Sequence, residues 1–178
     1  GGSWLESSGA VFAENQALAW LAGLAGFPES SVGVFVPGGT MGNLSALVAA
    51  REAASSRRGG RPQRWSVVCS AEAHSSIAHA ARVMDIDIIP APADDAGRLT
   101  GESVRAALAS ADDGVFAVVA TAGTTNLGIV DDLAGIATAA GEADIWFHVD
   151  GAYGLAALAV PEGRAQFAGL EMADSFIT

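Results

Sequence analysis

Short apolar runs alternate along the chain with segments whose apolar residues recur at helical spacing. The runs cover residues 34–36, 65–69, 86–89, 115–120 and 145–149, and Pro90 ends the third of them. Helical spacing is found in residues 11–25, from 44 onward, in 77–84, after Thr100 and in 133–140. Strands that are apolar on both faces and separated by helices are typical of a parallel sheet with helices on both faces. The pattern therefore predicts a single α/β domain.

Four clusters of small and polar residues follow predicted strands. They are residues 37–43 (PGGTMGN), 70–76 (SAEAHSS), 121–126 (TAGTTN) and 150–154 (DGAYG). Ligands of open parallel sheets bind outside the carboxyl ends of the strands. We therefore expect all four clusters to open onto one edge of the sheet.

The first cluster has the features of an anion-binding site. Gly38 and Gly39 let the backbone approach a ligand, and the helix predicted next directs free N–H groups and its positive dipole end to the same place. Thr40 adds a hydroxyl donor and a helix cap. An ordinary helix start explains the same residues. The spacing fits neither a Walker A loop nor a dinucleotide-binding fingerprint.

Asp150 follows an apolar run at the end of a predicted strand, so we expect its carboxylate to be partly buried. Burying a charge is costly unless a cation or hydrogen-bond donors compensate it. The three histidines and the single cysteine lack the spacing of a metal site, so we expect no metal. A protonated ring nitrogen would satisfy the carboxylate, and such a ring draws electrons from a breaking bond in pyridoxal phosphate. His74 is the candidate for a ring that stacks on this cofactor, with a surface or capping role as the alternative. His79 and His148 are interpreted as structural.

Composition narrows the range of partners. The chain has 178 residues, of which 51% are hydrophobic, and a formal net charge of −11. Such a charge disfavours nucleic acid and anionic membranes as partners. Neither a membrane span nor a signal peptide is visible, and Cys69 lies in an apolar run typical of a buried core thiol. We therefore expect a cytoplasmic protein.

The ordered set of motifs resembles the pyridoxal-phosphate-dependent amino-acid decarboxylases of the group that includes aromatic-amino-acid, glutamate and diaminobutyrate decarboxylases. The resemblance rests on residues 33–51, 73–84, 118–133, 146–158 and 173–178. It implies fold type I, as in aspartate aminotransferase, and a homodimer that converts a small-molecule amino-acid substrate to an amine and carbon dioxide. The chain would be part of the cofactor-binding large domain, incomplete at both ends.

The resemblance also implies roles for single residues. Gly39 and Thr40 match the phosphate-binding turn, and Ser175 matches a serine near the phosphate. His74 matches the histidine that stacks on the ring, and Thr121 matches a threonine near the ring. Asp150 matches the acid paired with the pyridine nitrogen, and Ala152 matches a small residue packed on the ring. His74 and Asp150 are the expected catalytic residues. The chain departs from many members at Met41-Gly42 and at Gly151.

The chain has no lysine, because all nine basic residues are arginine. The family's Schiff-base lysine follows the motif at 173–175 within a few residues, beyond Thr178. We therefore expect these 178 residues alone to be inactive. Two alternatives remain open at this point. One is another pyridoxal-phosphate enzyme of this fold, either a carbon–carbon lyase or an aldehyde-forming enzyme. The other is a non-catalytic binding or assembly module.

Overall fold

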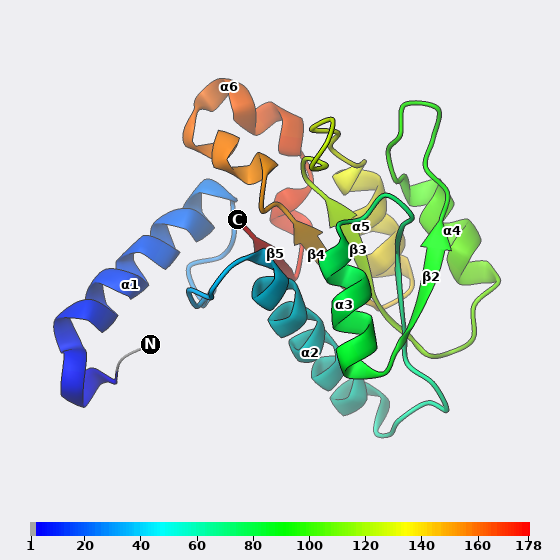
Figure 1. Ribbon diagram of the computed structural model, residues 1–178, viewed down its shortest axis with the longest axis horizontal. Helices are drawn as coiled ribbons and strands as arrows, with labels where there is room; N and C mark the ends of the chain where they lie inside the picture. The colour runs from blue at the N-terminus through cyan, green and yellow to red at the C-terminus, as the bar shows by residue number, and fades with distance from the viewer. Residues whose placement is uncertain (1–2) are drawn as a thin grey trace.

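A five-stranded parallel sheet forms the centre of the computed structural model, which describes residues 3–178 (Figure 1). The strand order is β2-β1-β3-β4-β5, and every neighbouring pair is parallel. The strands are β1 (Ser66–Ser70), β2 (Asp87–Ala91), β3 (Val115–Thr121), β4 (Trp146–Asp150) and β5 (Ser175–Ile177). Strands β1 and β3 are buried along their whole length, as their apolar runs require.

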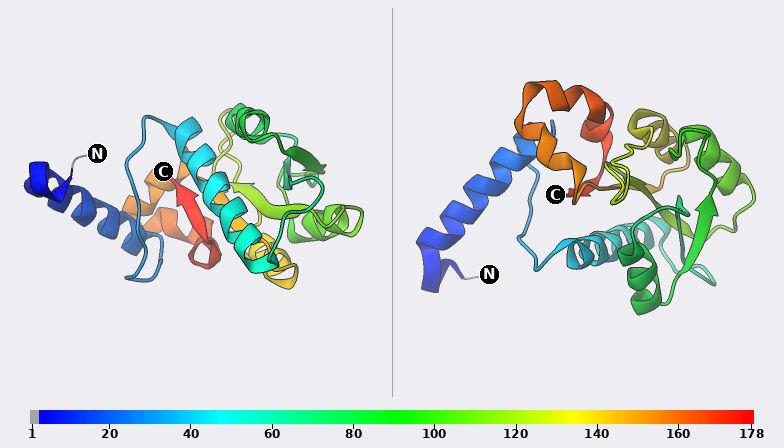
Figure 2. Two further views of the ribbon diagram at one scale, coloured as in Figure 1. Left: turned by 90° about the horizontal axis from the view of Figure 1, so that it is seen from below. Right: turned by 45° about the horizontal axis from the view of Figure 1, so that its top comes forward.

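Helices cover both faces of this sheet (Figures 1 and 2). Helices α2 (Gly39–Arg58) and α3 (Ser75–Met84) pack on one face, and α4 (Gly101–Ala109) and α5 (Leu133–Glu142) pack on the other. The remaining elements are α1 (Trp4–Leu24), η1 (Gly154–Ala159), α6 (Pro161–Arg164), η2 (Ala165–Phe167) and η3 (Leu170–Met172). The α/β fold predicted from the pattern is confirmed.

Alternation along the strands creates two hydrophobic cores, one on each face. In β1, Val67 faces the core under α2 and α3, whereas Val68 faces the core under α4 and α5. In β3, Val118 and Val119 divide in the same way. Burial on both faces holds the strand ends rigidly, and the site is built on these ends.

The helix boundaries follow from capping side chains. The Thr100 hydroxyl accepts a hydrogen bond from the Ser103 backbone N–H, and the Asp132 carboxylate accepts one from the Gly135 N–H. Each side chain satisfies a backbone donor that the first helical turn leaves free. The predicted start of α4 is therefore confirmed. Asp132 is the N-cap of α5.

Two strand predictions need correction. Residues 34–36 form no strand. Val34 and Phe35 are 62% and 58% exposed, so these apolar side chains are not buried in the sheet as the pattern predicts. The strand predicted to end before Pro90 runs through it to Ala91. Proline is tolerated there because β2 is an edge strand, where an N–H can face away from the ladder.

The chain reverses its direction of travel across the sheet between β1 and β3. From β1 it crosses to β2 on one side and then returns past β1 to β3 on the other. Loops leaving β1 and β3 therefore diverge at their carboxyl ends and open a crevice between them. Such a crevice is the usual ligand site of an open parallel sheet.

Helix α1 stands apart from this body as a projecting arm (Figure 2). None of its residues is buried. In the described part of the chain, no helix combines the length and the hydropathy that crossing a membrane requires.

Candidate functional site

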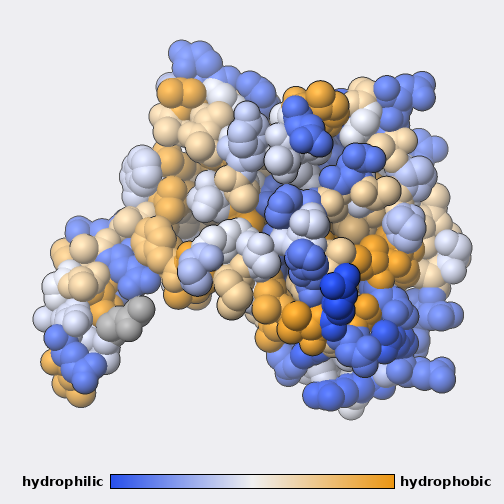
Figure 3. Space-filling model, in the orientation of Figure 1, coloured by the Kyte–Doolittle hydropathy of each residue, from blue (hydrophilic) through white to orange (hydrophobic). Residues whose placement is uncertain are grey.

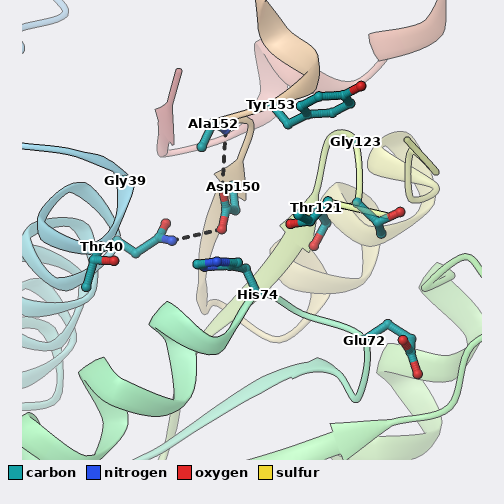
Figure 4. A pocket seen from close by; sticks show the side chains of 12 residues that line it. Gly39, Thr40, Glu72, His74, Thr121, Gly123, Asp150, Ala152 and Tyr153 are labelled. Atoms are coloured by element: carbon teal, nitrogen blue, oxygen red, sulfur yellow. Dashed lines mark hydrogen bonds between the residues drawn. The ribbon is translucent and has the colours of Figure 1, made fainter. Parts of the chain in front are cut away.

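A cavity of about 210 Å³ lies at the carboxyl ends of the strands (Figure 4). Thr121 is the last residue of β3, Asp150 is the last residue of β4, and His74 immediately precedes α3. The first turn of α2 closes the side near Asp150. The cavity is lined by Gly39, Thr40, Asn43, Glu72, His74, Thr121, Gly123, Thr124, Thr125, Asp150, Ala152 and Tyr153. All four polar clusters thus meet at one edge, as predicted.

The start of α2 presents unpaired backbone donors to this cavity. Gly38 has a φ of 96°, a conformation that favours glycine, and its carbonyl accepts hydrogen bonds from the N–H groups of Met41 and Gly42. Helix geometry leaves the N–H groups of Gly39 and Thr40 without intrahelical acceptors. A phosphate at this position would receive these two N–H groups and the positive end of the dipole of α2.

Gly39 also sets how closely α2 approaches the sheet. A Cβ atom on Gly39 would lie 3.3 Å from both the Ala152 Cβ and the Ile177 Cδ1 atoms. A side chain at this position would therefore require Ala152 or Ile177 to shift by a few tenths of an ångström. The same contact places the Ala152 methyl group at the cavity wall beside the phosphate-binding candidate.

The Asp150 carboxylate is only 6% exposed, yet it lines the cavity. One oxygen, Oδ2, accepts a hydrogen bond of 2.8 Å from the Asn43 side-chain amide, and the other, Oδ1, accepts a longer one of 3.3 Å from the Ala152 backbone N–H. A carboxylate has about four acceptor positions, so Asp150 retains capacity for a further donor. Burial makes that further donor valuable, because water solvates the charge poorly there.

The His74 ring is directed into the cavity toward Asp150 (Figure 4). Its Nδ1 atom accepts a hydrogen bond of 3.2 Å from the Ser76 backbone N–H and lies 2.9 Å from the Ser76 hydroxyl. The residue therefore caps α3, which is the alternative role left open by the sequence, and it lines the cavity as well. Capping fixes the ring at one nitrogen and leaves its face free.

A second buried carboxylate supports the cavity from behind. The two oxygens of Asp131 accept hydrogen bonds from the backbone N–H groups of Leu99, at 2.8 Å, and Thr121, at 2.7 Å. Burial raises the pKa of Asp131 to about 6, although both hydrogen bonds act to lower it. This residue fixes the end of β3 and does not line the cavity.

His148 is fully buried beneath the site. Its Nε2 atom lies 2.9 Å from the Asn43 Oδ1 atom, and its Nδ1 atom lies 2.9 Å from the Ser175 hydroxyl. Burial lowers the pKa of His148 to about 4, against the opposing effects of the Asp150 charge and the Ser175 backbone, so the ring is neutral at pH 7. The interpretation of His148 as a hydrogen-bonded structural residue is confirmed.

The structure brings six of the seven predicted site residues to the cavity: Gly39, Thr40, His74, Thr121, Asp150 and Ala152. Ser175 does not line it. Its hydroxyl accepts a hydrogen bond from the Trp146 indole N–H at 2.8 Å and contacts His148. A role near a phosphate therefore has no support from the position of Ser175. His79 is exposed on α3 and is likewise absent from the cavity wall.

Sequence reasoning missed the residue that links this site together. Asn43 is 1% exposed and bonds to Asp150, Ser76 and His148. Its spacing from Gly39 indicates a place at the site. Asn43 follows Gly39 by four residues, and residues four apart lie on the same face of a helix. The aromatic ring of Tyr153 and the carboxylate of Glu72 were also missed, and both lie at the cavity.

The donor set fits pyridoxal phosphate. A buried carboxylate with an open acceptor position suits a protonated pyridine nitrogen, and a helix start with free N–H groups suits a phosphate. Within residues 3–178, no group of three or more histidine, cysteine, aspartate or glutamate side chains is arranged to hold a metal ion.

Comparisons with known proteins agree with this geometry. The model of the pyridoxal-dependent decarboxylase conserved domain matches residues 3–178. The aromatic-L-amino-acid decarboxylase of Bacillus atrophaeus is 33% identical over 97% of this chain and 37% of its own length. The L-2,4-diaminobutyrate decarboxylase of Rhizobium meliloti is 39% identical over 97% of the chain and 35% of its own length. The chain thus spans little more than a third of these relatives.

A solved structure from the same family has a similar fold. The glutamate decarboxylase domain of the diaminobutyrate-pyruvate transaminase and L-2,4-diaminobutyrate decarboxylase from Vibrio parahaemolyticus superimposes with a TM-score of 0.87 and is 31% identical. The match covers 98% of this chain and 41% of that one. Sequence, fold and site geometry agree, and the chain belongs to the pyridoxal-dependent decarboxylase family.

Proposed function

We propose that the protein containing this chain is a pyridoxal-phosphate-dependent enzyme that converts an L-amino acid to an amine and carbon dioxide, with this chain as part of its cofactor-binding large domain. The observation that carries the proposal is the Asp150 carboxylate, which is buried at a strand end with an open acceptor position facing the cavity. Family membership supports the reaction class.

Bound pyridoxal phosphate supplies a protonated pyridine ring that accepts the electrons of the bond being broken. Asp150 holds the proton on the ring nitrogen, because a negative charge beside that nitrogen favours its charged form. The backbone donors of Gly39 and Thr40 and the Thr40 hydroxyl bind the phosphate. His74 would stack on the ring, and Ala152 and Thr121 would limit the space around it.

The arrangement divides orientation and proton control between separate elements. The start of α2 would hold the phosphate, and Asp150 at the end of β4 would hold the ring nitrogen. The strand end and the start of α2 are parts of the packed fold, and precise orientation of reacting groups is a major source of enzymatic rate. Lysine is absent from these 178 residues, so covalent attachment of the cofactor requires a residue outside them.

The direct test uses the full-length protein reconstituted with pyridoxal phosphate and supplied with a panel of L-amino acids. Release of carbon dioxide with an equal amount of amine supports the proposal. Aldehyde products or cleavage of another carbon–carbon bond would indicate a different reaction of the same cofactor. Cofactor binding without turnover of any amino acid would indicate a binding module.

We further propose that the full-length protein is a cytoplasmic homodimer. The arm formed by α1 supports the dimer, because Trp4, Phe12 and Trp20 are more than half exposed on a helix without a buried residue. Figure 3 shows this arm projecting from the body with some hydrophobic residues on its surface. A second copy of the chain would cover this surface. Analytical ultracentrifugation tests the dimer: a full-length protein that stays monomeric at micromolar concentration would contradict it.

The proposed cytoplasmic location is consistent with the single cysteine of the chain. Cys69 is free and buried, as expected in a reducing compartment.

A further inference from the structure

Asn43 lies at the wall of the candidate cofactor site and contacts three buried polar side chains. Its amide nitrogen, Nδ2, is 2.8 Å from the Asp150 Oδ2 atom and 2.8 Å from the Ser76 hydroxyl oxygen. Its amide oxygen, Oδ1, is 2.9 Å from the His148 Nε2 atom. Three of the four hydrogen-bonding positions of the side-chain amide, both N–H donors and one acceptor position of the oxygen, are thus used by the protein itself.

The charge of Asp150 decides which way this amide points. An ionised carboxylate only accepts hydrogen bonds, so the Asn43 nitrogen must face it. The second N–H of the same amide is then donated to the Ser76 hydroxyl. In the reversed orientation, the amide oxygen would face the carboxylate and two acceptors would oppose each other in a buried site.

The amide oxygen in turn sets the tautomer of His148. Because Asn43 Oδ1 is an acceptor, the His148 Nε2 atom must carry the proton of the neutral ring. The His148 Nδ1 atom then accepts from the Ser175 hydroxyl, whose oxygen receives the Trp146 indole N–H. The opposite tautomer would aim Nδ1–H at the Ser175 carbonyl oxygen, 3.2 Å away, and leave two facing acceptors at Asn43.

The same reasoning extends from Asn43 to the other cofactor-facing residue. The Ser76 hydroxyl oxygen accepts a hydrogen bond from the Asn43 amide, so its own O–H is free to donate to the His74 Nδ1 atom, 2.9 Å away. The Ser76 backbone N–H is directed at the same nitrogen. The proton of a neutral His74 therefore lies on Nε2. One chain of hydrogen bonds fixes both side chains that face the cofactor.

We propose that Asn43 is a positioning residue that orients Asp150 directly and His74 through Ser76, and that His148 fixes the orientation of the Asn43 amide. This inference rests on the proposed function and deepens it. Asn43 touches neither the substrate nor the reacting atoms in this role. It acts by holding one acid and one ring in a single relative arrangement.

The first test measures cofactor binding by the full-length apoprotein carrying Asn43→Leu, which keeps the branched side-chain shape and removes all side-chain hydrogen bonds. We expect roughly tenfold weaker pyridoxal phosphate binding, since hydrogen bonds to a buried charged group are among the stronger ones. The pH at which the absorption band of the bound cofactor changes should also shift. The control is Leu47→Ala, one turn further along α2 at a fully buried apolar position. It should lower stability while leaving both readouts near wild-type values.

The second test compares His148→Gln with His148→Leu. Glutamine can donate an amide N–H to Asn43 Oδ1 as the imidazole does, whereas leucine cannot. Both variants lose the buried ring, so a purely structural role predicts the same result for the two. We expect His148→Gln to bind pyridoxal phosphate within about threefold of wild type and His148→Leu to bind at least about tenfold more weakly. This pair keeps the test decisive even if Asn43→Leu does not fold.

The outcomes separate this inference from the proposed function. A wild-type full-length protein that fails to bind pyridoxal phosphate overturns both. If wild type binds and Asn43→Leu matches it in affinity and in the pH of the spectral change, the positioning role is wrong and the proposed function stands. Equal losses in the two His148 variants would likewise overturn the role given to His148 in orienting the amide.

Discussion

Two aspartates at the same edge of the sheet are buried to the same extent and have different surroundings. Asp131 and Asp150 are each 6% exposed. Asp131 uses both oxygens in short hydrogen bonds to backbone N–H groups of Leu99 and Thr121. Asp150 receives one short hydrogen bond and one long one, and its remaining capacity faces a cavity. Burial of an acid therefore does not identify a ligand site, whereas unused acceptor capacity at a cavity does.

The two acids also differ in the kind of group that holds them. Burial raises the pKa of Asp131 to about 6, because the surrounding protein solvates its charge poorly. The fixed backbone donors around it hold a loop and leave no room for a ligand. Asp150 is held by a side-chain amide, which is itself held by His148 and can be altered without disturbing the backbone.

The largest expected effect comes from removing the cavity-facing acid. Asp150→Ala in the full-length enzyme should lower kcat roughly 100- to 1000-fold, the usual loss when a group that stabilises transition-state charge is deleted. Steady-state kinetics with reconstituted protein measures it, and circular dichroism checks that the fold is kept. Near-normal turnover in a folded variant would remove Asp150 from the proposed site.

The buried histidine predicts a dependence of stability on pH. The pKa of His148 is lowered to about 4 in the folded protein, against 6.5 for an unperturbed histidine. Between these values the unfolded chain binds a proton that the folded chain does not, so His148 reduces the free energy of unfolding as pH falls, by at most about 3 kcal/mol. Full-length His148→Gln should lose less stability than wild type over this range. Parallel curves from chemical denaturation would contradict the prediction.

Substitution of Asp131, whose carboxylate binds backbone N–H groups, should lower the stability of the protein more than its kcat. Asp131→Asn keeps one acceptor oxygen and turns an amide N–H toward the backbone donor of Leu99 or Thr121, at a cost of about 1–3 kcal/mol for one unsatisfied buried donor. Thermal unfolding measures the loss. The kcat of the folded variant should fall far less than that of Asp150→Ala, and an equal fall would erase the distinction between the two acids.

The smallest effect is expected at the proposed phosphate site. Thr40→Ala removes one hydroxyl donor and keeps the backbone N–H groups, so affinity for pyridoxal phosphate should weaken about three- to tenfold. Titration of the full-length apoprotein with the cofactor measures it, and Thr138→Ala on the exposed face of α5 is a matched control. Unchanged affinity would mean that the Thr40 hydroxyl does not contact the phosphate.

Most of the fold could be predicted from the sequence because periodicity reports burial directly. The runs at 115–120 and 145–149 are apolar on both faces and correspond to β3 and β4. The run at 34–36 has the same apolar character, but it pairs with no strand among the described residues, and Val34 and Phe35 are exposed. Strand β5 was missed because three residues beginning with a serine show no period.

The candidate site could be predicted at positions where the type of one residue already indicates its chemical role. A carboxylate after an apolar strand and glycines before a helix stand out in the sequence, and both line the cavity. The Asn43 network was not predictable, because it depends on which atoms of residues 33 to 107 positions apart meet in space. Ser175 illustrates the same limit, since its hydroxyl faces Trp146 and His148 and not the cavity.

The most direct measurement is the protonation of the pyridine nitrogen in the full-length protein loaded with 15N-labelled pyridoxal phosphate. The 15N chemical shift should report a protonated nitrogen in wild type and in Asp131→Asn, and an unprotonated one in Asp150→Asn. A nitrogen that stays protonated in folded Asp150→Asn would contradict the pairing of this carboxylate with the cofactor.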